Sequence, residues 1–175
     1  MRPVPAPIAD DRVLSALWRY WEGKRGDLPM PRRRDIDPVD IPSLLPHLML
    51  VERTPEGRFR YRLAGTAVVQ AYGRELTGRC IDEVIPEPRR VFAQRHYNTV
   101  FTSARPIFVR NRYTAPNATD FVVSRIMLPL STDSPDLVQL VLIGQTFEYS
   151  SAFAQRLSGN PTIDAAFDKI EFLDG

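Results

Sequence analysis

The chain has 175 residues, of which 43% are hydrophobic and 25% charged, a composition that can bury a core and that excludes an intrinsically disordered protein. Its formal net charge is +2, and acidic and basic residues are mixed along most of the chain, which argues against a nucleic-acid partner. Arg32-Arg33-Arg34 is the one basic run and is interpreted as a solvated loop. The single cysteine, Cys80, excludes an internal disulfide and a thiolate metal cluster.

The sequence also lacks the signals of secretion and membrane insertion. Residues Met1 to Ala9 alternate prolines with small residues and contain no apolar stretch typical of a signal peptide. The longest apolar run, Leu137 to Ile143, is interrupted by Gln139 and is far too short for a spanning helix. We therefore expect a soluble, cytoplasmic protein with no membrane insertion.

The first predicted element is an amphipathic helix that Asp10 and Asp11 can cap. Its apolar stripe has the spacing i, i+3, i+4 and i+7 and consists of Leu14, Leu17, Trp18 and Trp21. Two exposed tryptophans would form an adhesive patch, so the stripe should be covered by the parent domain or by a second subunit. We therefore treat these four residues as a candidate interface of a homodimer.

A proline-fixed segment and a hairpin follow this helix. Asp37-Pro38 and Ile41-Pro42 each predict the start of a short helix, and Pro46 should end the second one. From Leu48 to Val51, and again from Phe59 to Leu63, the hydrophobic period is two, with a turn between the two runs. The pattern predicts an antiparallel hairpin.

Two helices are predicted after the hairpin. Thr66 can cap a short helix from Ala67 to Tyr72, which Gly73 should end in a left-handed conformation. A longer helix begins near Pro88, and its apolar face runs from Phe92 to Ala104. His96 and Tyr97 lie on this face and should point inward.

Three strand candidates complete the pattern, at residues 107–114, 121–130 and 137–149. In the last two, apolar residues occupy odd-numbered and even-numbered positions alike, so both faces of these strands should be buried and both faces of the sheet covered there. The order predicts an α+β fold with a five-stranded antiparallel sheet, helices on one face and the N-terminal helix or a partner subunit on the other. We divide the chain into an N-terminal helix and lead-in (1–46), a core (47–149) and a tail (150–175) whose role the sequence does not reveal.

Several short motifs in this order resemble a PAS domain. They are Tyr-Arg-Leu-Ala-Gly-Thr-Ala at 61–67, Gly-Arg-Glu-Leu-Thr-Gly at 73–78 and Leu-Pro-Leu-Ser at 128–131. The Trp-containing helix and the Asp-Pro, Ile-Pro and Leu-Leu-Pro lead-in are similar to those of stand-alone bacterial single-PAS proteins. The resemblance covers about residues 13–149 and implies a sensory or protein-interaction module with a small-molecule cavity between sheet and helices.

Residues 73–80 could also be interpreted as a nucleotide-binding or a flavin-binding segment. Arg79 and Cys80 replace the Lys and Ser/Thr of a nucleotide-binding P-loop, and a parallel strand–helix–strand context is missing. Cys80 falls one position earlier than the cysteine of flavin-binding photosensory PAS domains, so we expect no flavin adduct. Heme-binding PAS domains use a histidine on the long helix, which makes His96 a possible heme ligand, although a lone buried histidine is more often a hydrogen-bonded core residue.

Enzyme interpretations find little support, because the chain has two histidines far apart in sequence, no nucleophile elbow and no paired inward carboxylates. Isomerase-like chemistry on His96 or Tyr97 is the remaining enzymatic alternative. The leading hypothesis is a non-enzymatic regulatory module that binds a small molecule, a partner signalling protein, or both. Inward residues with a polar group are the candidate ligand contacts: Tyr72, His96, Tyr97, Asn111, Arg125 and Gln139.

Arg125 is distinctive among these candidates, because it lies in an apolar strand between Ser124 and Ile126. A buried guanidinium needs an acceptor such as a carboxylate or a phosphate. Arg125 either anchors an anionic ligand, or reaches a sheet edge or pairs with an internal acid. The alternative to a ligand sensor is a pure interaction or dimerisation module with a filled core.

Overall fold

The computed structural model describes residues 1–114, 120–132, 137–149 and 161–173. These residues form one antiparallel sheet of seven strands in the order β2-β1-β5-β4-β3-β6, with β7 also paired to β3. The strands are β1 (Leu48–Arg53), β2 (Phe59–Ala64), β3 (Ile107–Thr114), β4 (Asp120–Leu130), β5 (Leu140–Tyr149), β6 (Thr162–Ile163) and β7 (Lys169–Phe172). The predicted α+β class and antiparallel hairpin are confirmed.

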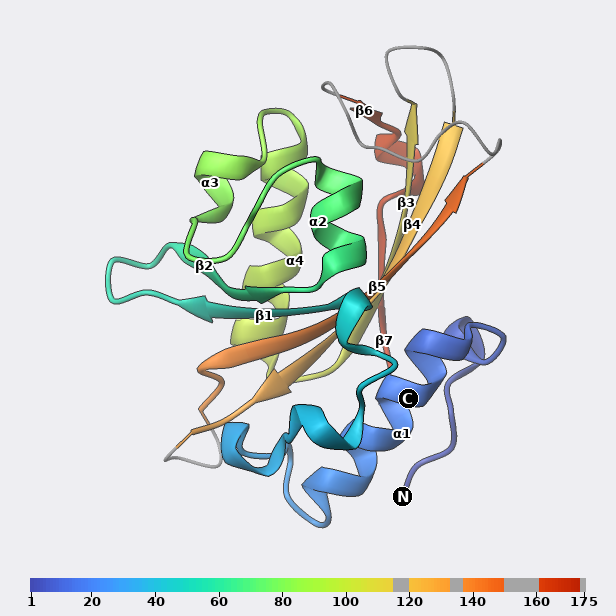
Figure 1. The fold of residues 1–175 in the computed structure, drawn as a ribbon, viewed down its shortest axis with the longest axis vertical. Helices are drawn as coiled ribbons and strands as arrows, with labels where there is room; N and C mark the ends of the chain where they lie inside the picture. Colours follow the sequence, from blue (N-terminus) through green and yellow to red (C-terminus); the bar gives the residue numbers. More distant parts are fainter. Residues whose placement is uncertain (115–119, 133–136, 150–160, 174–175) are drawn as a thin grey trace.

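Helices cover both faces of the sheet (Figure 1). The α-helices are α1 (Arg12–Arg25), α2 (Thr66–Tyr72), α3 (Ile81–Val84) and α4 (Arg89–Ser103). The 3₁₀ helices are η1 (Ala6–Ile8), η2 (Arg33–Asp35), η3 (Pro38–Asp40), η4 (Leu45–His47) and η5 (Ala165–Phe167). Helices α2, α3 and α4 lie on one side, here called the inner face, and α1 lies on the other, the outer face.

Helix α1 covers the outer face of its own sheet. The Asp11 carboxylate caps it by accepting hydrogen bonds from the backbone N–H groups of Val13 at 2.9 Å and Leu14 at 3.0 Å. The predicted apolar stripe packs mainly against β5, and all four of its side chains are fully buried: Leu14, Leu17, Trp18 and Trp21. The prediction of a homodimer interface at these residues is therefore corrected, because their own chain covers them.

Gly144 on β5 allows this close approach. A Cβ atom at position 144 would lie 2.7 Å from Cδ2 of Leu17 and 3.3 Å from Cδ2 of Leu14. Strands β4 and β5 are buried at positions of both parities, as the sequence pattern predicted for a sheet covered on both faces.

Two details of the segment before the sheet and helix α2 differ from the prediction. The second short helix begins at Leu45 rather than at Ile41-Pro42, so Pro46 lies inside it. Gly65, not Thr66, is the N-cap of α2. Gly65 is required by close packing, since a Cβ there would lie 2.2 Å from the carbonyl oxygen of Leu45. Gly73 ends α2 with φ of 68°, as predicted.

The described part of the tail extends the sheet beyond the five predicted strands. Strand β6 pairs with the end of β3 at Tyr113 and Thr114, and β7 pairs with its beginning, from Ile107 to Arg110. Such short strands carry too few residues for a hydrophobic period to be recognised. Residues 161–173 are here called the C-terminal segment; they protect the edge of β3.

Candidate functional site

The strand register places a row of polar side chains on the inner face. Arg125 on β4 lies directly opposite Gln145 on β5 and Val109 on β3. Directly opposite residues in an antiparallel sheet share a face, and so do residues two positions apart on one strand. Arg125 and Gln145 therefore lie on the same face as Asn111, which is two residues beyond Val109.

Tyrosines from several elements surround Arg125. Its charge acts on Tyr61 from β2, Tyr97 from α4 and Tyr113 from β3, and it is coupled in the same way to Tyr72 from α2. Burial raises the pKa of Tyr61, Tyr97 and Tyr113 above the ordinary tyrosine value. These three hydroxyls therefore stay neutral at physiological pH and do not balance the positive charge.

No carboxylate in the described part of the chain forms an ion pair with Arg125. The residue is only 5% exposed, and its Nε atom has no hydrogen-bond partner. A buried charge without a counterion costs several kcal/mol unless something else supplies the missing interaction. Arg125 is thus not at a solvated sheet edge, and it is not paired with any acid of the described residues.

Three buried side chains near Arg125 share its lack of hydrogen-bond partners. Both amide atoms of Gln145 lack partners, as do Nδ1 of His96 and Oδ1 of Asn111. Gln145 and Asn111 are fully buried, and His96 is 1% exposed. Buried polar atoms in proteins are nearly always hydrogen-bonded, so several unpartnered atoms in one region call for an explanation. We call the set Arg125, Gln145, His96 and Asn111 the inner polar cluster.

Asp168 of the C-terminal segment reaches the inner polar cluster. Its Oδ1 atom lies 2.7 Å from Nε2 of His96 and accepts a 2.5 Å hydrogen bond from Nδ2 of Asn111. Its backbone carbonyl accepts from Arg95 at 3.2 Å, and its Oδ2 atom pairs with the same guanidinium. The Asp168 side chain is completely buried by these contacts.

Burial and these contacts together shift the pKa values of both partners. Burial alone would raise the pKa of Asp168, but hydrogen bonds from His96 and Asn111 lower it overall. Burial lowers the pKa of His96, an effect that the Asp168 contact opposes without reversing it. At neutral pH the pair is therefore a carboxylate and a neutral imidazole whose Nε2–H donates to Asp168.

The structure places most of the predicted ligand contacts around one region. Tyr72, His96, Tyr97, Asn111 and Arg125 converge between the sheet and helices α2 and α4. Gln139 does not: it precedes β5, is only partly buried, and its backbone N–H donates to the carbonyl of Leu130. The prediction for Gln139 is therefore wrong in its placement.

Sequence reasoning missed Gln145 and Asp168. Gln145 could have been found, because it interrupts an apolar strand in the same way as Arg125 and has the inward parity. Asp168 carried no such signal, since nothing in its neighbourhood predicts a strand or a buried acid. Only the fold brings Asp168 beside a helix 72 residues earlier in the chain.

A heme bound through Nε2 of His96 does not fit this arrangement. Iron at that nitrogen would displace the Asp168 contact and leave a carboxylate buried with fewer partners. The described residues also contain no group of three or more His, Cys, Asp or Glu side chains arranged to hold a metal ion.

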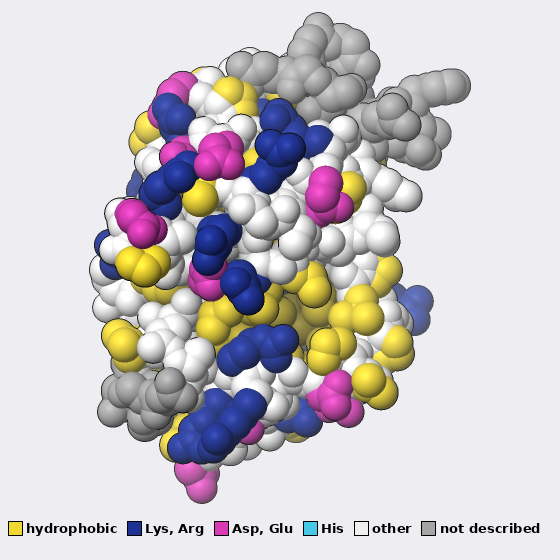
Figure 2. Space-filling model, turned by 60° about the vertical axis from the view of Figure 1, so that its left-hand side comes forward, with side chains coloured by type: hydrophobic (Ala, Val, Ile, Leu, Met, Phe, Trp, Pro, Cys, Tyr) yellow, Lys and Arg dark blue, Asp and Glu magenta, His cyan; other side chains and the backbone are white. Residues whose placement is uncertain are grey.

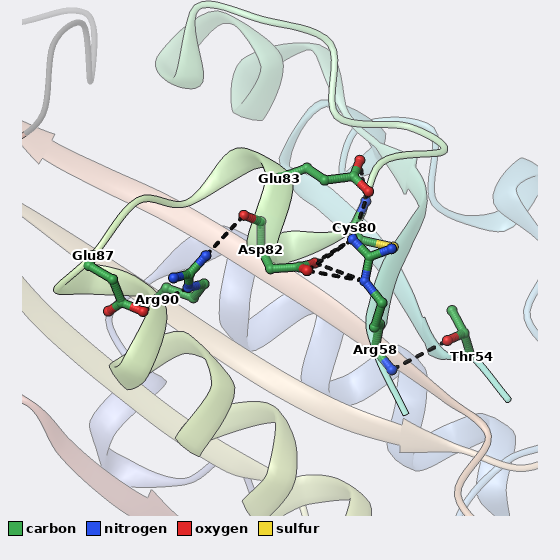
Figure 3. A network of polar contacts seen from close by, with 7 residues as sticks. All are labelled: Thr54, Arg58, Cys80, Asp82, Glu83, Glu87 and Arg90. Atoms are coloured by element: carbon green, nitrogen blue, oxygen red, sulfur yellow. Dashed lines mark hydrogen bonds and ion pairs between the residues drawn. The ribbon is translucent and has the colours of Figure 1, made fainter. Parts of the chain in front are cut away.

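The segment around Cys80 forms a structural network (Figure 3). Cys80 caps α3 and is 7% exposed, and burial raises the pKa of its thiol. Asp82 and Glu83 both bind Arg58 of the hairpin, at 2.9 Å and 2.7 Å. Instead of forming a pair of free carboxylates, the two acids tie α3 to the hairpin.

The outer face carries a surface groove of a different character. A groove of about 480 Å³ lies between η1 and the β3–β7 edge, lined by Ala6, Pro7, Phe108, Arg110, Ala166, Phe167, Lys169 and Glu171. Its arginine already has a partner, since Arg110 pairs with Glu148 at 3.1 Å. Figure 2 shows a different side of the molecule, with the β1–β2 hairpin and α3 turned forward, and there Lys and Arg side chains lie among Asp and Glu side chains. None of the residues that line the groove has a buried side-chain polar atom without a hydrogen-bond partner, in contrast to the inner polar cluster.

Comparison with known proteins agrees with this architecture. The family whose sequence profile matches is described as PAS domain, and the match spans residues 10–144. The chain belongs to the PAS domain family. The family comprises sensory and regulatory domains, and the match includes α1 as well as the sheet and inner helices. A search of curated proteins finds no match.

Two solved structures are similar to this PAS domain. One is described as the Rhodobacter sphaeroides LOV protein, with 16% identity and a TM-score of 0.45, covering 67% of this chain and 70% of that one. Another is described as the RsLOV d2 variant, with 18% identity and a TM-score of 0.45, covering 70% of this chain and 68% of that one. No helix in the described ranges is both long and apolar enough to cross a membrane.

Proposed function

We propose that this PAS domain is a non-enzymatic sensor that binds a small anionic molecule between its sheet and helices α2 and α4. Arg125 would anchor the anion, and the ligand would supply the counter-charge that no described carboxylate supplies. The observation that carries this proposal is the buried guanidinium without an ion pair to any described carboxylate. Carboxylates and phosphates are the natural partners of such a group.

The surroundings of Arg125 suit a ligand better than a packed core. Gln145 opposite Arg125 offers one donor group and one acceptor, and both are unpartnered. The tyrosines from β2, β3, α2 and α4 can contact the body of a small organic molecule while excluding water. Exclusion of water strengthens an ionic contact.

The proposed output is a change of contacts with a partner signalling protein. Ligand binding can shift a conformational equilibrium only if the two states bind the ligand differently. The inner polar cluster draws its side chains from β3, β4, β5 and α4, and Asp168 of the C-terminal segment contacts two of them, His96 and Asn111. A ligand at Arg125 would therefore act on several elements together.

The test is a thermal-shift screen with small carboxylates and phosphates, followed by calorimetry on hits. Wild-type protein should bind at least one acid, and Arg125→Met should weaken that binding at least 100-fold. Arg110→Met is the matched control, because Arg110 is an arginine of the neighbouring strand on the outer face, paired with Glu148. Equal affinity in wild type and Arg125→Met would refute the anchor role.

A further inference from the structure

We propose that the ligand is an anion that also carries a hydrogen-bond donor, such as a hydroxy acid or an amino acid, and that Asp168 is the residue that imposes this requirement. The inference rests on the proposed function, since it deepens the description of the same site. Asp168 acts as a positioning residue: it turns His96 and Asn111 into acceptors toward the ligand.

The first step concerns Asn111. A carboxylate only accepts hydrogen bonds, so the atom of Asn111 at 2.5 Å from Asp168 Oδ1 must be the amide nitrogen. The amide oxygen is then the remaining polar atom of that side chain. It is buried and has no partner. Asp168 thereby fixes the orientation of the amide and leaves an open acceptor.

The second step concerns His96. The nitrogen at 2.7 Å from Asp168 Oδ1 is Nε2, and a contact of this length between a ring nitrogen and a carboxylate requires the proton on Nε2. The neutral ring then presents a lone pair at Nδ1. That atom is also buried and unpartnered. His96 therefore adds a second open acceptor on the α4 side.

The third step combines these acceptors with Arg125. A simple anion would satisfy the guanidinium but would leave two acceptors buried without donors. Each unsatisfied buried polar group carries a desolvation penalty, so a ligand that lacks the donor should bind more weakly. Sites built to hydrogen-bond a ligand hydroxyl or amine discriminate strongly against the analogue without it. The ligand that satisfies the site therefore carries one anionic group and at least one N–H or O–H donor.

The placement of Asp168 explains why this chemistry involves the C-terminal segment. Asp168 lies between η5 and β7, next to strand β3, and inserts its side chain between β3 and α4. Arg95 binds both its backbone carbonyl and its carboxylate. The segment thus completes the site from its edge.

The first test needs no ligand. Long-range ¹H–¹⁵N NMR of the full chain at pH 7 should show His96 as a neutral ring protonated at Nε2. In Asp168→Asn the new amide can donate to Nε2 and should move the proton to Nδ1. Asp164→Asn, in the same segment, is the control and should leave the His96 spectrum unchanged. A wild-type ring protonated at Nδ1, or a doubly protonated ring, would overturn the inference.

The second test uses matched acids as probes: lactate with propionate, 4-hydroxybenzoate with benzoate, and alanine with propionate. Wild type should bind the donor-bearing member of at least one pair tenfold or more tightly than its counterpart, and Asp168→Asn should remove that preference. Binding that requires Arg125 but shows no preference would refute the inference and leave the proposed function standing. Binding that survives Arg125→Met, or no binding of any acid, would count against both.

Discussion

Both faces of the sheet are covered by helices, but they differ in whether their buried polar atoms have partners. Under α1, the indole N–H groups of Trp18 and Trp21 donate to the carbonyls of Pro3 at 3.1 Å and Pro129 at 3.0 Å. The buried carboxylate of Glu22 pairs with Arg2 and Arg25. Every one of these polar groups has a partner within the chain.

The electrostatics of the two faces differ accordingly. Burial alone would raise the pKa of Glu22, but hydrogen bonds from Arg25 and Arg2 lower it to about 2, so this charge is balanced. On the inner face, Arg125 has no such balance, and the cluster around it holds several unpartnered atoms. This contrast between balanced charges on the outer face and an unbalanced charge on the inner face is the basis of the ligand site proposed above.

The largest expected effect is on the outer face. Trp21→Ala should lower the free energy of unfolding by about 3 to 5 kcal/mol, because it removes a fully buried ring and its hydrogen bond. Urea unfolding followed by circular dichroism measures this change. Ligand affinity of the folded fraction should stay unchanged. A loss below about 1 kcal/mol would contradict the structural role of α1.

The inner face should respond in the opposite direction. Arg125→Met should raise the free energy of unfolding of the ligand-free protein by about 1 to 3 kcal/mol, because it removes an uncompensated buried charge and keeps an apolar side chain of similar length. The same unfolding assay applies, with Arg110→Met as the control expected to change little. A marked destabilisation by Arg125→Met would show that the guanidinium already has a good partner.

A smaller effect of the same sign is expected at Gln145. Gln145→Leu should stabilise the ligand-free protein by about 1 kcal/mol, since it replaces an amide with two unpartnered atoms by an apolar side chain of similar volume. It should also weaken binding of the acid found in the screen. If it destabilises the protein instead, water or a rearranged side chain must satisfy the amide.

The smallest effect is a pH dependence set by Asp168 and His96. A carboxyl whose folded pKa lies below its ordinary value of 3.8 contributes stability above that value and loses it as the pH falls through the folded pKa. A histidine whose folded pKa is lowered from 6.5 also costs stability as the pH falls below 6.5. Both terms predict declining stability between pH 7 and pH 3.

Asp168→Asn should flatten this decline at its acidic end, below about pH 4, where the wild-type carboxyl takes up its proton. Asp164→Asn should retain the wild-type profile. Melting temperatures at half-unit pH intervals measure the effect. A steeper decline in Asp168→Asn would contradict the lowered pKa of Asp168.

Much of the fold could be predicted from periodicity, whereas the site could be predicted only in part. The strand at residues 107–114 and the inward position of Arg125 follow from local patterns. The prediction for Gln139 is wrong because Gln139 and Gln145 are six positions apart, so on one continuous strand both would face the same side. The strand begins only at Leu140, which leaves Gln139 outside it. Asp168 was not predictable, because its burial arises from long-range packing against α4 and β3.

Native mass spectrometry after incubation with the acid panel gives the most direct test of ligand binding at Arg125. Wild type and Arg125→Met would be compared under native and denaturing conditions, with the Arg110→Met variant alongside. The proposal predicts an added mass on wild type and on Arg110→Met that vanishes on denaturation, and no added mass on Arg125→Met. The same added mass on all three proteins, or on none of them, would contradict it.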